Sequence, residues 1–89
     1  IKEQGGVEVK GTLGIKVQYP GDDVDLQVAG AIRFADKKLS VGLSEPYEGT
    51  FNNGDIVYNS NVTAGGYIGW VCIESGTPGV WKRFGVIEA

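Results

Sequence analysis

The fold is decided by residues 67–87, YIGWVCIESGTPGVWKRFGVI. Two apolar stretches, Tyr67–Glu74 and Val80–Ile87, are separated by the turn-forming residues Ser75-Gly76-Thr77-Pro78-Gly79. Pro78 fixes its own φ for a turn, and Gly79 supplies a position that tolerates a positive φ. The stretch therefore predicts a β-hairpin.

Turn signals before this hairpin predict one more strand. Asn52-Asn53-Gly54 favours the positive φ angles of a tight turn. We expect residues 55–58 to form a strand after it, and residues 59–66 to form a polar loop.

Residues 35–50 are predicted to connect two halves of the domain. Asp36-Lys37-Lys38 has the composition of a solvated turn, and Leu39–Leu43 is expected to form one short strand. Glu45-Pro46 is expected to end that strand, because a residue before proline is restricted and proline donates no backbone hydrogen bond.

The N-terminal half carries the clearest alternation in the chain. From Val24 to Phe34 one parity is apolar and the other is small or polar, as expected of a strand with one buried face. These residues would span roughly 36 Å if extended, about twice a usual strand, so we predict two strands bent at Ala29-Gly30. Another alternating stretch, Leu13–Tyr19, precedes the turn residues Pro20–Asp23 and predicts a hairpin or meander.

Taken together, these patterns predict an all-β protein. The 15 glycines and the β-branched residues favour strands over helices. We expect short antiparallel strands and hairpins in a small sandwich or barrel-like module, in which residues 1–50 form a stem or first half-sheet. Residues 51–89 form the aromatic C-terminal hairpin tip of the same domain.

Composition narrows the classes of function. With 8 Lys and Arg against 11 Asp and Glu, the net charge is -3, so we expect no nucleic-acid partner. The apolar runs are far shorter than the ~20 residues that a membrane helix needs, so we expect no membrane insertion. The chain has no His and a single Cys, Cys72, which removes the usual nucleophile–base pairs. We predict a non-enzyme without metal or cofactor.

Size suggests association. A chain of 89 residues buries only ~60–65% of its unfolded surface, so its stability alone is marginal and copies are expected to associate. The first residue is Ile1 and no Met is present, from which we expect a piece of a longer protein.

The hairpin and the residues before it resemble a known family. Asp55–Ser60, Thr63–Cys72 and Ser75–Gly85 are similar to a C-terminal segment of phage tail spikes, tail fibres, pre-neck appendages and related β-helical glycan-degrading proteins. The resemblance covers roughly the last 35 residues. It implies a homotrimer with an intertwined N-terminal part, a capping or surface-binding role, and any hydrolase or lyase activity in an upstream body.

Aromatic residues are the candidate ligand site. Flat rings stack on sugar faces at low entropic cost, and four such residues are the candidates for binding a host cell-surface polysaccharide: Tyr58, Tyr67, Trp70 and Trp81. The alternative, which we favour for the two tryptophans, is that Trp70 and Trp81 are cross-strand core partners.

Other reactive groups have an ordinary structural interpretation. Carboxylates with apolar neighbours are candidates for acid–base chemistry, but solvation at the surface is favoured for Glu45, Glu48 and Glu74. A Ca²⁺ loop is only weakly matched, and turn positions are favoured for Asp22, Asp23, Asp25 and Asp36. Cys72 is in phase with Trp70 and is expected to be a buried, inert thiol.

Two hypotheses follow from the sequence. The first is a homotrimeric C-terminal module of a tail spike or fibre, located in the virion tail or outside the cell, that assembles and attaches to a surface glycan. The second is a monomeric carbohydrate-binding module of a secreted glycan-active enzyme. The oligomeric mass distinguishes them.

Overall fold

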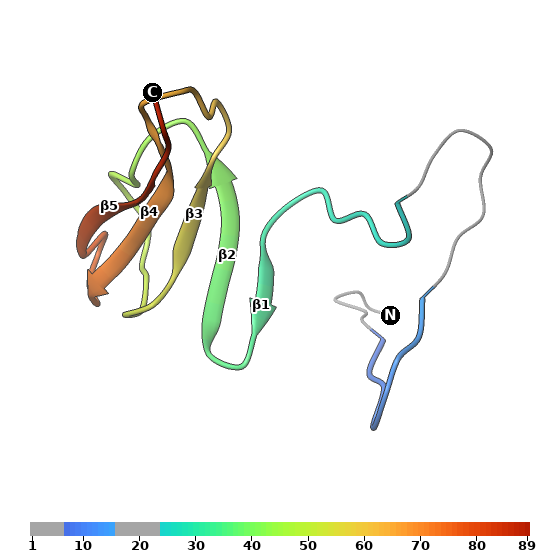
Figure 1. Ribbon diagram of the computed structural model, residues 1–89. Helices are drawn as coiled ribbons and strands as arrows, with labels where there is room; N and C mark the ends of the chain where they lie inside the picture. The colour runs from blue at the N-terminus through green and yellow to red at the C-terminus, as the bar shows by residue number, and fades with distance from the viewer. Residues whose placement is uncertain (1–6, 16–23) are drawn as a thin grey trace.

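The computed structural model describes residues 7–15 and 24–89, and it confirms the all-β prediction. Five strands form one mixed sheet in the order β1-β2-β3-β4-β5 (Figure 1). They are β1 (Ile32–Phe34), β2 (Lys37–Gly42), β3 (Ile56–Asn59), β4 (Tyr67–Glu74) and β5 (Val80–Val86). The described strands make a single open sheet with β1 and β5 at its edges, rather than the two packed sheets or the barrel expected from the sequence.

The predicted C-terminal hairpin is present. β4 has the bounds expected for it, and β5 ends at Val86, one residue earlier than predicted. The two strands pair antiparallel, with an irregularity in the register between Cys72 and Glu74. Gly79 has a φ of 87° in the connecting turn, as the sequence predicts.

β2 and β3 are parallel, so the prediction of purely antiparallel strands was wrong for this pair. Parallel neighbours need a connection that crosses the sheet, and residues 43–55 supply it without forming a helix. This crossover loop leaves the end of β2 and returns along the sheet to the start of β3 (Figure 1). The predicted turn at Asp36–Lys38 is shorter than expected, because Lys37 already begins β2.

The two predicted N-terminal strands are largely absent. Only Ile32–Phe34 is a strand, and residues 24–31 run away from the sheet (Figure 1). A strand is stabilised by its neighbours, and this segment has no neighbouring strand in the described chain. Leu13 and Ile15 are exposed and form no strand. Residues 16–23 of the predicted hairpin or meander lie outside the described residues.

One face of the sheet contains the core. Ser40, Val57, Trp70 and Arg83 are register partners across β2 to β5, and Cys72 pairs with Trp81 beside them. Partners in register have their side chains on the same face. The buried core consists of Val57, Trp70, Cys72 and Trp81, with Phe51 and Tyr67 packed against it. We call this the covered face.

The opposite face is apolar as well, but two rows of register partners on it contribute no residue to the buried core of the described chain. One row of register partners crosses all five strands: Ile32, Leu39, Ile56, Val71 and Lys82. The next row consists of Val41, Tyr58, Gly69 and Phe84. We call these two rows the open face. Its side chains are half-buried to exposed, and Val41 reaches 68% exposure.

Candidate functional site

The crossover loop closes the covered face. Phe51 and Gly76 exchange two backbone hydrogen bonds, of 2.9 and 3.1 Å. The Phe51 ring lies edge-on to Trp81, with 5.0 Å between ring centroids, and the Lys38 ammonium lies 4.2 Å from the centroid of the same ring. The backbone N–H of Asn53 donates to the Ser75 hydroxyl at 2.7 Å. These contacts hold the loop against the β4–β5 end of the sheet.

Asp55 is a buried carboxylate at the end of this loop. Its Oδ1 accepts a hydrogen bond from the backbone N–H of Lys38 at 2.8 Å. Its Oδ2 accepts from the backbone N–H of Asn52 at 2.9 Å. A buried carboxylate is tolerated only when its oxygens are hydrogen-bonded. Since one donor belongs to β2 and the other to the loop, the two bonds join β2 to the loop. Asp55 is therefore a structural residue, and both oxygens are engaged.

A cavity of about 530 Å³ lies on the covered face between the crossover loop and the hairpin. Its wall on the loop side comes from Leu43, Ser44 and Glu45. On the hairpin side it is lined by aromatic and cationic side chains, namely Tyr67, Trp70, Trp81, Lys82 and Arg83.

Tyr67 and Arg83 form one border of this cavity. The Tyr67 ring lies edge-on to Trp70 with 5.4 Å between centroids, and the Arg83 guanidinium carbon lies 5.2 Å from the Tyr67 centroid. Both residues also line a second cavity of about 330 Å³, together with Gly65, Gly66, Phe84 and Val86. The pair therefore borders both hollows.

Three of the four predicted ligand residues meet at the first cavity. Tyr67, Trp70 and Trp81 line it, whereas Tyr58 lies on the open face, in register with Gly69. Trp70 is 4% exposed and Trp81 7%, and the Trp81 Nε1–H donates to the Pro78 carbonyl at 2.8 Å. The two indoles are thus core residues, as favoured for them, but they are not direct register partners, because Trp70 pairs with Arg83 and Trp81 with Cys72. Tyr67 is the aromatic ring left for a ligand.

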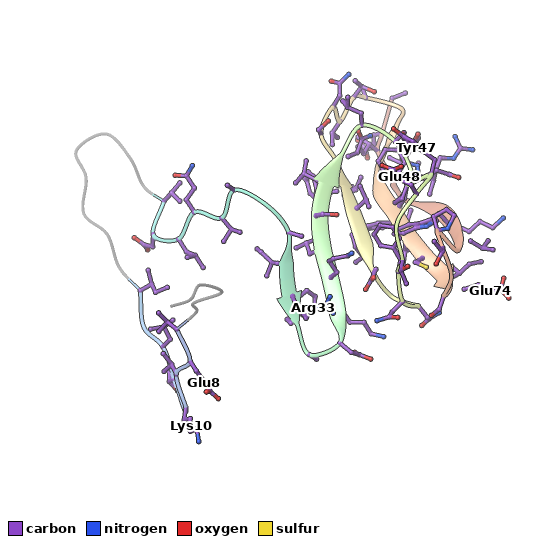
Figure 2. The ribbon with its side chains drawn as sticks, turned by 180° about the vertical axis from the view of Figure 1, so that it is seen from behind. Glu8, Lys10, Arg33, Tyr47, Glu48 and Glu74 are labelled. Atoms are coloured by element: carbon purple, nitrogen blue, oxygen red, sulfur yellow. The ribbon has the colours of Figure 1, made fainter. Side chains whose placement is uncertain are left out.

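The candidate carboxylates lie on different parts of the fold. Glu45 lines the cavity. Figure 2 shows Glu48 beside Tyr47 on the crossover loop and Glu74 at a distant end of the sheet. Acid–base work on a glycosidic bond needs two carboxyl groups ~5–10 Å apart across the substrate, and Glu48 and Glu74 do not provide this.

The remaining reactive residues have structural positions. Cys72 is a free, fully buried thiol whose Sγ–H donates to the Glu74 carbonyl at 3.3 Å. Asp36 lies in the turn between β1 and β2, 3.7 Å from the Lys37 Nζ. No group of three or more His, Cys, Asp and Glu side chains that suits a metal ion occurs among the described residues. Asp22 and Asp23 lie outside them.

Sequence reasoning missed the cationic part of the cavity. Lys82 and Arg83 are adjacent in β5, so they belong to opposite faces of the strand, yet both line the cavity. The signal for Arg83 was available, because it shares the parity of Trp81 and so faces the core side. The contribution of Leu43–Glu45 depends on the crossover and had no signal in the sequence.

Comparisons with protein-family models, with curated proteins and with solved structures find no match to this chain. In the described part of the chain, no helix is long and apolar enough to cross a membrane. The site is therefore interpreted from its own geometry. It offers one accessible aromatic ring, two cations and one carboxylate in a shallow hollow, a set suited to non-covalent binding.

Proposed function

We propose that the chain is a non-catalytic assembly module that associates with further copies of itself through the open face. The observation that carries the proposal is the row from Ile32 to Lys82, which is apolar at four of its five positions and crosses the whole sheet. In the single chain Ile32 is exposed, whereas Leu39, Ile56 and Val71 are half-buried. A contiguous apolar surface that stays partly exposed on a small protein marks an interaction site.

The apolar character of both faces argues against a solvated open face. Antiparallel sheets with one wet face alternate apolar and polar residues. In β4 the run Ile68 to Ile73 is apolar on both parities. Fully burying one large apolar side chain contributes about 1.5–3 kcal/mol, so covering half-exposed side chains such as Val41 and Tyr58 contributes about 1 kcal/mol each.

The wider setting of the module is the C-terminal part of a tail spike-like or tail fibre-like protein, in the virion tail or outside the cell. The likeness of residues 55–85 to such segments supports this setting and a homotrimer. The absence of His from the chain supports a non-catalytic role, because the commonest general base is missing.

The test is a charge placed on the open face. Val41→Asp introduces a carboxylate where the side chain is exposed in the single chain, so its own fold is expected to survive while association is lost. Tyr47→Asp is the matched control, since Tyr47 is 82% exposed on the crossover loop over the other face. Equal masses for both variants and the parent chain in light scattering would reject the proposal.

Glycan binding at the cavity is the second candidate function. It is favoured by the Tyr67–Arg83 pair, where an accessible ring lies beside a guanidinium group, and by Glu45 and Ser44 across the hollow. Aromatic rings with adjacent hydrogen-bonding groups suit sugars. The test is a titration with a neutral oligosaccharide and with an oligouronate, read from the backbone and indole N–H resonances that line the cavity. No change with either sugar would reject it.

A further inference from the structure

The segment before β1 has no place in the sheet of its own chain. Residues 24–31, here called the arm, lead away from the sheet without forming a strand (Figure 1). Its apolar side chains are nevertheless large and repeated: Leu26 and Val28 are exposed, Leu26 at 59%. Exposure of several apolar residues on one segment costs free energy that a partner surface can recover.

The alternation of apolar residues in the arm continues in sequence into β1. Ile32 is the first residue of the row that crosses all five strands on the open face. Counting back from Ile32 in steps of two reaches Val28 and Leu26, whereas Asp25 and Gln27 have the other parity. If the arm is extended, one side is apolar and the other is polar.

We propose that the arm of one copy lies extended across the open face of a second copy, with Leu26 and Val28 directed at that sheet and Gln27 directed at solvent. This inference rests on the proposed self-association and names its contacts. Both apolar features belong to the same chain, so each copy supplies one arm and receives one.

The areas support this occupant. Five strands ~4.8 Å apart and about six residues long give a face of roughly 20 by 20 Å, or about 400 Å² of flat area. Stable interfaces take ~800 Å² from each partner, so the face alone is too small. The arm of residues 24–31 extends ~26 Å at ~3.3 Å per residue, which is enough to cross the sheet and to add a second apolar strip.

The charges on both surfaces are compatible with this contact. Within the two rows of the open face, Lys82 is the only charged residue, and the apolar side of the arm carries none. No like charges are therefore brought together when the arm is docked. In a ring of three copies each arm lies on the next face, so every arm and every face is used once.

Disulfide trapping tests the placement. One chain carries Leu26→Cys and is labelled with ¹⁵N, and the second, unlabelled chain carries Tyr58→Cys on the open face. The chains are mixed, allowed to exchange and oxidised with diamide. Mass spectrometry of digested material should find the peptide pair that joins positions 26 and 58. Gln27→Cys in place of Leu26→Cys is the matched control, one residue away and of opposite parity, and should be trapped several-fold less.

The outcomes are distinguishable. Preferential trapping from position 26 supports the inference. Equal trapping from positions 26 and 27 overturns it. A chain that carries both Leu26→Cys and Tyr58→Cys, mixed as labelled and unlabelled copies, overturns it too if every disulfide joins two peptides with the same label. That second result places the arm on the sheet of its own chain. If Val41→Asp dissociates the assembly while Leu26→Asp does not, self-association stands and the arm contact falls. A monomeric parent chain overturns both.

Discussion

The ring of Phe51 lies edge-on to the indole of Trp81, with centroids 5.0 Å apart and ring planes at 83°. This contact joins the crossover loop to the last strand and makes the two faces of the sheet unequal. On one face the loop covers a small core built from Val57, Trp70, Cys72 and Trp81. The other face has equally apolar side chains and no comparable cover in the described chain.

Removing the Phe51 ring should loosen this cover. Phe51 is partly buried, so Phe51→Ala is expected to lower the free energy of unfolding by about 2–3 kcal/mol, less than the ~3–5 kcal/mol of a fully buried phenylalanine. Urea denaturation at a fixed chain concentration measures it. Tyr47→Ala on the same loop should change the stability by less than about 0.5 kcal/mol. Equal effects would show that the Phe51 contact does not hold the loop.

The hydrogen bonds of Asp55 give a second stability prediction. Asp55→Ala leaves the backbone N–H groups of Lys38 and Asn52 without their carboxylate acceptor. Hydrogen bonds to charged groups contribute ~1.5–3 kcal/mol each, so a loss of about 3 kcal/mol is expected. The comparison is Asp36→Ala, because Asp36 is exposed and its ion pair with Lys37 is 3.7 Å long; such pairs contribute about 0–1 kcal/mol. A mild Asp55→Ala effect would contradict the structural role.

Core and cavity roles can be separated by two substitutions in β5. Trp81→Ala should lower the free energy of unfolding by about 3–5 kcal/mol, a large share of the ~5–15 kcal/mol that stabilises a small domain. The variant should therefore lose its β-sheet circular dichroism signal on mild heating. Arg83→Gln removes a cation from an exposed position and should leave the fold nearly unchanged while weakening any sugar titration. Loss of structure in Arg83→Gln, or sugar binding that is unaffected by it, would contradict this division.

The C-terminal part of the fold was predictable because its signals are local. Pro78 and Gly79 mark a turn between two apolar stretches, and Gly54 marks another, with a φ of 94°. Proline fixes its own φ and glycine permits the positive φ that other residues avoid, so both mark turns whatever surrounds them. The bounds of β4 and the position of β3 followed directly, as did the core position of Trp70 and Trp81.

The errors arose where the outcome depends on distant partners. Apolar and polar residues alternate from Val24 to Ala31 as they do in a strand. Alternation predicts only which side of an extended segment is apolar, whereas a strand also needs a neighbour to pair with. The parallel pairing of β2 with β3 depends on the path of residues 43–55, which carries no periodic pattern. The same path brings Glu45 to the cavity and buries Asp55, so neither was predictable.

The mass of the chain in solution tests the central claim most directly. Multi-angle light scattering at micromolar concentration should give three times the chain mass of 9.5 kDa, and Val41→Asp should reduce it to that of one chain. A parent chain that remains a folded monomer at this concentration, with its open face in water, would contradict the account.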